Sequence, residues 1–133
     1  MTVEISRENI ECPFCRAHDR GEFYAENGAV FALEDQNPVT PGHIIIMPKR
    51  HAADFYSMTD QELADANTLI RLLSDRIRKS DKRVTGFNIG ANCGASAGQT
   101  VMHAHIHLIP RRNGDAKNPR GGVRGVIPGK RDY

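Results

Sequence analysis

The sequence predicts an α+β fold: a five-stranded antiparallel meander sheet with one long helix and short helices. Two observations predict the sheet, namely short runs of β-branched and aromatic residues and the turn signals between them. A third observation, a single amphipathic stretch after residue 59, predicts the long helix. Strands on both sides of one long helix, joined by short connections, are typical of this class. The 133 residues suffice for one core, so residues 1–133 are interpreted as a single domain.

Three strands are predicted before the helix. Residues 22–26 and 29–35 are expected to form a hairpin, because Asn-Gly at 27–28 favours a tight turn. Residues 36–42 contain two prolines and a glycine and predict a loop. Residues 43–48 carry three consecutive isoleucines, which indicates a strand buried on both faces.

The helix is expected to begin after Thr59, because Thr59 and Glu62 match a capping box. Apolar residues then recur at three- and four-residue steps on one face: Leu63, Ala66, Ile70, Leu73 and Ile77. That face would pack on the sheet. The helix would fray over residues 79–83. Residues 85–93 and 101–110 predict the fourth and fifth strands, with a loop of small residues between them.

The fifth predicted strand carries the most informative pattern. His103, His105 and His107 occupy every second position, so an extended backbone would direct all three imidazoles to one face. A neutral imidazole is a nucleophile near physiological pH, and its neighbours can orient or protonate the group it attacks. Taken alone, the same histidines also suit a catalytic zinc ion with a bound water, or a strand whose histidines are merely solvated or hydrogen-bonded.

The run 103–109, His-apolar-His-apolar-His-apolar-apolar, resembles the signature of the histidine triad superfamily of nucleotide hydrolases and transferases. Gly-Gln-Thr at 98–100 and Pro-Arg at 110–111 resemble that family too. The resemblance implies that His105 is the nucleophile. The reaction would cleave at the α-phosphate of dinucleoside polyphosphates or nucleoside phosphoramidates. It would pass through a nucleotidyl-histidine intermediate and release a nucleoside monophosphate.

The resemblance also implies the residues around His105. His103 and His107 complete the catalytic set, Asp35 accepts the ribose hydroxyls, and the phosphate contacts are Asn92, Gln99, Thr100 and His107. Phe14 and Ile44 are looser candidates for the wall that contacts the base. The loop over 92–100 supplies small residues and backbone donors, which a bound phosphate needs. As alternatives, Thr100 caps a turn and Asp35 is an ordinary turn residue. His18 and His43 match no motif position and are interpreted as structural or surface residues.

Cys12 and Cys15 are spaced as in half of a zinc site or in a redox couple. A redox couple needs a strand before the motif, and residues 8–11 are too short for a convincing one. His51 resembles a zinc ligand of the metal-bearing branch of the family, in which the first triad histidine, here His103, completes a Cys2His2 site. We therefore expect structural zinc with no open position for water. A reduced, metal-free thiol pair is the alternative.

Positive charge is concentrated in the Gly-rich tail over residues 111–133. The tail holds seven Lys or Arg against two Asp, a balance of +5, while the other 110 residues carry −3. Such a tail could attract a polyphosphate or RNA, although nucleic acid is not otherwise expected, or it could be a solvated terminus. Residues 118–128 resemble the C-terminal segment of bacterial family members, and Val123, Val126 and Ile127 predict that the segment docks.

Composition predicts a soluble, cytoplasmic protein without membrane association. No stretch of about 18 apolar residues is present, and residues 1–9 are too polar for a signal peptide. The resemblance implies a homodimer with a continuous sheet. Two other function classes stay open: a nucleotide-binding regulatory dimer with weak or vestigial catalysis, and a catalytic zinc hydrolase. A uridylyl transferase is disfavoured, because those longer chains have glutamine where His107 stands here.

Overall fold

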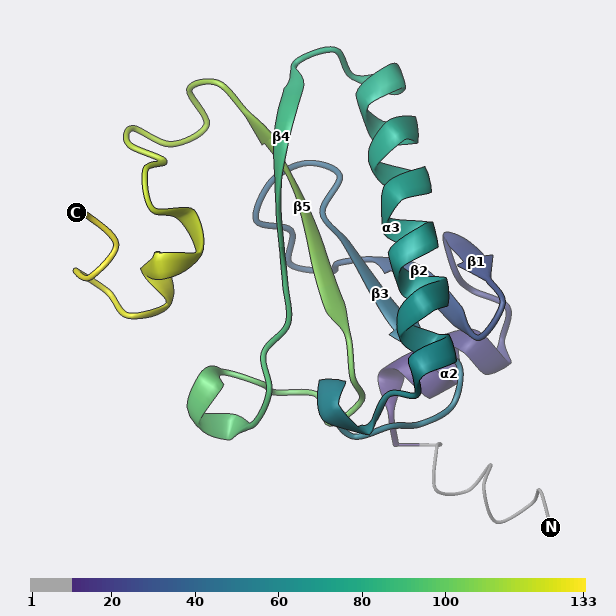
Figure 1. Ribbon diagram of the computed structural model, residues 1–133. Helices are drawn as coiled ribbons and strands as arrows, with labels where there is room; N and C mark the ends of the chain where they lie inside the picture. Colours follow the sequence, from purple (N-terminus) through teal and green to yellow (C-terminus); the bar gives the residue numbers. More distant parts are fainter. Residues whose placement is uncertain (1–10) are drawn as a thin grey trace, which may run out of the picture.

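The structure is a computed structural model that describes residues 11–133 (Figure 1). Residues 1–10 lie outside the described residues. They include residues 1–9, on which the signal-peptide interpretation depends, and most of residues 8–11, on which the redox interpretation depends. The α+β class and the five-stranded antiparallel sheet are confirmed. The elements are α2 (Pro13–Asp19), β1 (Ala25–Asn27), β2 (Val30–Glu34), β3 (Ile44–Pro48), α3 (Asp60–Ser80), β4 (Val84–Gly90), β5 (Ile106–Arg112) and the 3-10 helices η1 (Phe55–Ser57), η2 (Ala95–Ala97) and η3 (Gly122–Val126).

The strand order is β1-β2-β3-β5-β4, so the predicted meander holds only for the first three strands. The last strand, β5, inserts between β3 and β4 instead of following β4 at the edge. Burial gives the reason. Every residue of β3 is buried and β5 is buried at alternate positions, whereas only Val84 is buried in β4. The most apolar strands therefore occupy the centre of the sheet, and the chain crosses it through α3.

The fifth strand begins at Ile106, five residues later than predicted. The prediction that all three triad histidines share one strand face is therefore wrong, and only His107 lies in β5. The backbone before Ile106 bonds elsewhere: the N–H of Ala104 donates to the carbonyl of Ala52 at 2.7 Å. The pairing of β3 with β5 ends at the Ile46–Ile106 pair, close to Pro48, which has no N–H to donate.

The predicted helix and its capping box are confirmed. The N–H of Glu62 donates to the Thr59 hydroxyl at 3.0 Å, and the N–H of Thr59 donates to the Glu62 carboxylate at 2.8 Å. The buried face of α3 packs on one face of the sheet, with a core that includes Ala66, Leu69, Leu73, Ile44, Ile46 and Leu108. Residues of the opposite parity, among them Ile45 and His107, face the other side of the sheet. That side carries the candidate site.

The tail folds back beside β4 (Figure 1). A Cβ on Gly122 would lie 3.2 Å from the Asn88 amide nitrogen, so the tail approaches β4 through glycine backbone. Docking of the segment is thus confirmed. The prediction that apolar side chains dock it is wrong, because Val123, Val126 and Ile127 are 63, 77 and 57% exposed. Within residues 11–133, none of the helices combines the length and the apolar character that crossing a membrane requires.

Candidate active site and metal centre

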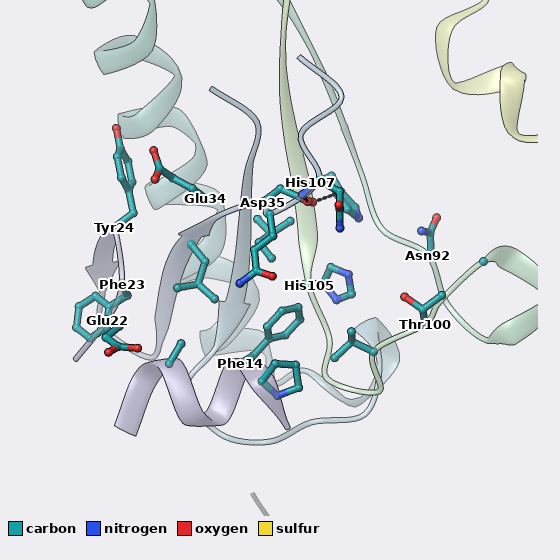
Figure 2. A pocket seen from close by; sticks show the side chains of 18 of the residues that line it. Phe14, Glu22, Phe23, Tyr24, Glu34, Asp35, Asn92, Thr100, His105 and His107 are labelled. Carbon is teal, nitrogen blue, oxygen red and sulfur yellow. Dashed lines mark hydrogen bonds and ion pairs between the residues drawn. The ribbon is translucent and has the colours of Figure 1, made fainter. Parts of the chain in front are cut away.

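A cleft of about 740 Å³ opens on the sheet face opposite α3 (Figure 2). Its lining brings together five residues that the sequence singles out: Asp35, Asn92, Thr100, His105 and His107. Phe14, Leu33 and Ile45 add apolar surface of the kind that a nucleobase needs. The prediction that Ile44 contacts the base is wrong, because the Ile44 side chain is buried in the core under α3. Ile45, its neighbour of opposite parity, lines the cleft instead.

The protonation state of His105 follows from one hydrogen bond. Its Nδ1 lies 2.8 Å from the backbone carbonyl oxygen of His103. A carbonyl can only accept, so Nδ1 carries a proton, and in the neutral ring Nε2 therefore keeps its lone pair. The ring of Phe14 meets the His105 ring edge-on with centroids 5.1 Å apart, which restricts its rotation. His105 thus presents a nucleophilic nitrogen at a fixed orientation.

His107 is held in the opposite protonation state. The N–H of Val39 donates to His43 Nδ1 at 3.0 Å, so the proton of neutral His43 sits on Nε2. His43 Nε2 lies 2.9 Å from His107 Nδ1 and donates to it. The proton of His107 is therefore on Nε2, where it can donate to a phosphate oxygen. Asp35 lies 3.4 Å from His43 Nε2, which adds an acceptor beside this pair.

Both histidines of this pair are neutral near pH 7. Burial is the main cause that lowers the pKa of His107, and the nearby His105 and His43 lower it further. Burial also lowers the pKa of His43, against the opposing effect of Asp35. The sequence interpretation missed His43 as a site residue. Its alternation with Ile45 in the sequence was the one signal, but the pairing of Ile45 with His107 that gives this signal its meaning is visible only in the fold.

Gln99 has a different position from the other predicted phosphate contacts. Asn92 and Thr100 line the cleft, whereas the Gln99 side chain is buried and bonds the backbone. Its Nε2 donates to the carbonyls of Ala53 at 2.7 Å and Val101 at 3.0 Å, and its Oε1 accepts from the N–H of Gly94 at 2.9 Å. Both amide hydrogens are used, so Gln99 braces the loop. A direct phosphate contact by Gln99 stays a prediction.

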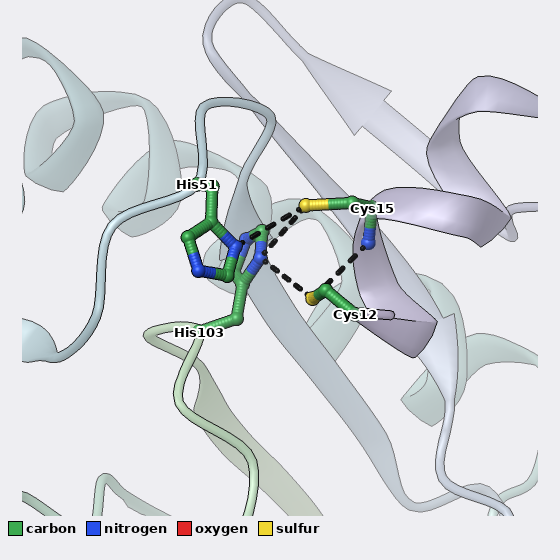
Figure 3. Close-up of side chains that lie close together, drawn as sticks. All are labelled: Cys12, Cys15, His51 and His103. Carbon is green, nitrogen blue, oxygen red and sulfur yellow. Dashed lines mark hydrogen bonds between the residues drawn. The ribbon is translucent and has the colours of Figure 1, made fainter. Parts of the chain in front are cut away.

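The predicted metal ligands Cys12, Cys15, His51 and His103 lie together, and one ligand atom from each falls within 4.8 Å of the others (Figure 3). Cys12 caps the N-terminus of α2, and Cys15 lies one turn later. His103 Nδ1 is 3.4 Å from both sulfur atoms, and His51 Nδ1 is 3.3 Å from Cys15 Sγ. The four donors therefore come from α2 and from two separate loops.

The donor set fits a zinc ion. His103 Nε2 donates to the carbonyl of Pro48 at 2.8 Å, so the lone pair on Nδ1 faces the sulfur atoms. Burial lowers the pKa of His103 to about 4, which keeps the ring neutral as a ligand. Burial, followed by the neighbouring Cys12, raises the pKa of the Cys15 thiol to about 12. A bound cation would reverse this and favour thiolates. Two sulfur and two nitrogen donors are the set of a closed structural zinc site.

Comparisons with known proteins identify a family and several similar chains. The HIT domain family model matches residues 19–114. An AP-4-A phosphorylase of Mycobacterium tuberculosis is 34% identical over 99 residues, which are 74% of this chain and 50% of that protein. An asymmetrical bis(5'-nucleosyl)-tetraphosphatase of Schizosaccharomyces pombe is 37% identical over 84 residues, or 63% of this chain and 46% of that protein. A Zn-bound histidine triad family protein from Mycobacterium smegmatis has a similar crystal structure, with TM-score 0.71, 32% identity, and coverage of 83% of this chain and 81% of that chain.

The buried histidines predict how stability depends on pH. Because burial lowers the pKa values of His43, His103 and His107, the unfolded chain takes up these protons at higher pH than the folded chain. Their contribution is fully present above pH 6.5 and is lost as the pH falls. For His103 in the metal-free chain, where its pKa is lowered to about 4, the loss between pH 7 and pH 4 is about 3 kcal/mol. Urea unfolding at pH 7, 6 and 5 measures the decline, which His107→Asn should make shallower. Constant stability over that range would contradict it.

Proposed function

The chain belongs to the HIT domain family, and from that premise we propose that it is a nucleotide hydrolase acting at the α-phosphate. The substrate class is a dinucleoside polyphosphate or a nucleoside phosphoramidate. The observation that carries the proposal is the hydrogen bond from His105 Nδ1 to the His103 carbonyl, because it selects the tautomer of the neutral ring in which Nε2 has the free lone pair. The sequence similarity to an AP-4-A phosphorylase and to a bis(5'-nucleosyl)-tetraphosphatase supports the first substrate class.

In the proposed reaction, His105 Nε2 attacks the α-phosphorus. A bond forms between Nε2 and phosphorus while the bond from phosphorus to the leaving group breaks, and the leaving group takes the electron pair. The His105 ring then carries positive charge, which the His103 carbonyl stabilises through Nδ1–H. Water attacks the same phosphorus in a second displacement, which breaks the nitrogen–phosphorus bond and releases a nucleoside monophosphate.

The neighbouring side chains would hold the substrate for this attack. His107 Nε2–H would donate to a phosphate oxygen, because the His43 contact places the proton there. Asn92 and Thr100 offer further donors on the side of His105 away from Phe14 (Figure 2). Asp35, at the end of β2, would accept hydrogen bonds from the ribose hydroxyls. Its Oδ1 already accepts from the N–H of Asn37 at 2.8 Å, which fixes its orientation.

The proposed nucleophile is tested by replacing it. His105→Ala should lower turnover of diadenosine tetraphosphate about 10³-fold or more, because the covalent route is lost. His18→Ala is the matched control, since it removes an imidazole outside the cleft. The products are AMP and ATP if water is the second acceptor. Formation of ADP in phosphate buffer would assign that role to phosphate. Near-normal turnover by His105→Ala would refute the nucleophile, and no turnover by the unaltered protein would favour the regulatory nucleotide-binding dimer.

We also propose that Cys12, Cys15, His51 and His103 bind one structural zinc ion. The ion would supply a rigid tetrahedral link between the N-terminal helix and the loop before β5. The Zn-bound relative and the position of the four donors support this. Such thiolate ligands need a reducing compartment, which agrees with the cytoplasmic location that the sequence predicts.

Metal analysis of tag-free protein, prepared without chelator, should give about one zinc per chain. Cys12→Ser should lose the metal and unfold at lower urea concentration, because the site is closed and structural. Cys93→Ser is the matched control and should keep the metal, since Cys93 lies outside the cluster. Absence of metal in the unaltered protein would refute the proposal. Full zinc in Cys12→Ser, with activity that chelation abolishes, would favour the catalytic zinc hydrolase.

We propose that two chains form a homodimer through the β4 edge. This edge strand has no hydrogen-bonded strand on its outer side among the described residues. Beside it lies an apolar hollow of about 510 Å³ between α3 and β4, with Ile89 49% and Tyr56 82% exposed. Light scattering at micromolar concentration should give the dimer mass. Tyr56→Asp should favour the monomer, whereas Tyr24→Asp in the cleft should not. A monomer mass for the unaltered protein would contradict the dimer.

A further inference from the structure

A second cavity of about 600 Å³ adjoins the nucleotide cleft. It lies between the tail and the exposed face of β4 and β5, and it shares two lining residues with the cleft, His107 and Asn92. Figure 2 shows the tail in pale yellow beyond Asn92, on the side of His107 away from Phe14. The two hollows therefore meet at the histidine that would hold the phosphate.

The lining of this second cavity changes character from one wall to the other. Next to the cleft it is polar, with His43, Asn88, Asn92 and His107. The far wall is the tail, which contributes apolar Val123 and Val126 together with the charged residue Arg131. Among the described residues that line this cavity, Arg131 alone carries a permanent charge. A cavity that begins at a phosphate-binding histidine and ends at a cation and apolar surface suits a polyphosphate that carries a nucleoside.

The tail holds Arg131 in place through its own backbone. Arg124 donates to the carbonyls of Arg131 at 3.3 Å and Lys130 at 3.4 Å. Gly121 lies in the left-handed region, with φ of 91°, and a Cβ there would collide with the Arg131 carbonyl. Arg131 Nε is buried and makes no hydrogen bond, its ion pair with Asp132 Oδ1 is long at 3.5 Å, and the Arg131 side chain as a whole is 39% exposed. A phosphate oxygen in the cavity would give Nε the hydrogen bond that the ion pair with Asp132 does not provide.

We propose that this second cavity is the leaving-group subsite for a dinucleoside polyphosphate. The proposal rests on the hydrolase function proposed above and specifies its substrate. The scissile bond joins the α-phosphorus, attacked from His105, to a bridging oxygen on the side of His107. When that bond breaks, the bridging oxygen keeps the electron pair and departs as part of a nucleotide. The phosphates of this nucleotide lie toward Arg131, and its nucleoside contacts the apolar residues of the cavity.

The subsite explains how one catalytic histidine could favour one leaving group over another. A polyphosphate carries charge along its length and reaches the tail, so Arg131 lowers the energy of its bound state. A small amine, the leaving group of a simple phosphoramidate, ends near His107 and gains nothing from Arg131. The basic tail therefore acts as a specificity element for the chemistry at His105.

The test compares two substrates that share the adenylyl group and differ in the leaving group. For each variant, kcat/KM is measured on diadenosine tetraphosphate and on an adenosine phosphoramidate with a small amine. In Arg131→Ala the ratio of the two values should fall about tenfold, because one charge-assisted contact is lost. Arg131→Lys should restore most of the ratio. Lys130→Ala, which removes the same charge at an exposed neighbouring position outside the cavity lining, should leave the ratio unchanged.

The outcomes separate the subsite from the hydrolase function. An unchanged ratio in Arg131→Ala, or an equal change in Lys130→Ala, overturns the subsite and leaves the hydrolase proposal intact. Failure of the unaltered protein to turn over either substrate overturns the hydrolase proposal. In that case, calorimetry with a non-hydrolysable methylene analogue of diadenosine tetraphosphate tests whether the subsite binds the polyphosphate. Binding should weaken about tenfold in Arg131→Ala but not in Lys130→Ala, and equal binding by both variants overturns the subsite.

Discussion

Two backbone carbonyl groups select the tautomers of His103 and His105 that the chemistry of this site needs. The carbonyl of Pro48 accepts from His103 Nε2, so Nδ1 of that ring faces the two cysteines. The carbonyl of His103 accepts from His105 Nδ1, so Nε2 is the nitrogen without a proton when that ring is neutral. Backbone oxygens cannot donate, and each bond therefore selects one tautomer without ambiguity. The nucleophile depends on the second of these bonds.

The single residue His103 links the proposed metal centre to the proposed active site. Its side chain lies between Cys12, Cys15 and Pro48, and its backbone oxygen orients His105. Any shift of the cysteine cluster would thus move the group that holds the nucleophile. The position of His51 depends in turn on Arg50, whose guanidinium donates to the buried Glu62 of α3 at 3.0 and 2.9 Å. The proposed metal ligands are connected through this ion pair to the helix on the opposite side of the sheet.

Local signals predicted the parts of the fold that depend on neighbouring residues. The capping box of Thr59 and Glu62 is confirmed, and so is the buried strand, predicted at residues 43–48 and found at 44–48, because both are determined within a few residues. The start of β5, the central place of that strand and the role of His43 could not be predicted in the same way. Each depends on which strands pair and in which register, and therefore on contacts between residues far apart in the sequence. The braced position of Gln99 is likewise set by Ala53, which lies 46 residues earlier.

The tautomers of the site histidines can be measured directly by ¹⁵N NMR of the imidazole nitrogens in the full chain near pH 7.5. We expect the proton of His105 on Nδ1 and the protons of His43, His103 and His107 on Nε2, because each ring has one backbone or histidine partner that fixes it. Such a spectrum would support the assignment of His105 as nucleophile and His107 as phosphate donor. A proton on Nε2 of His105 would contradict it, since the attacking lone pair would then be absent from the cleft.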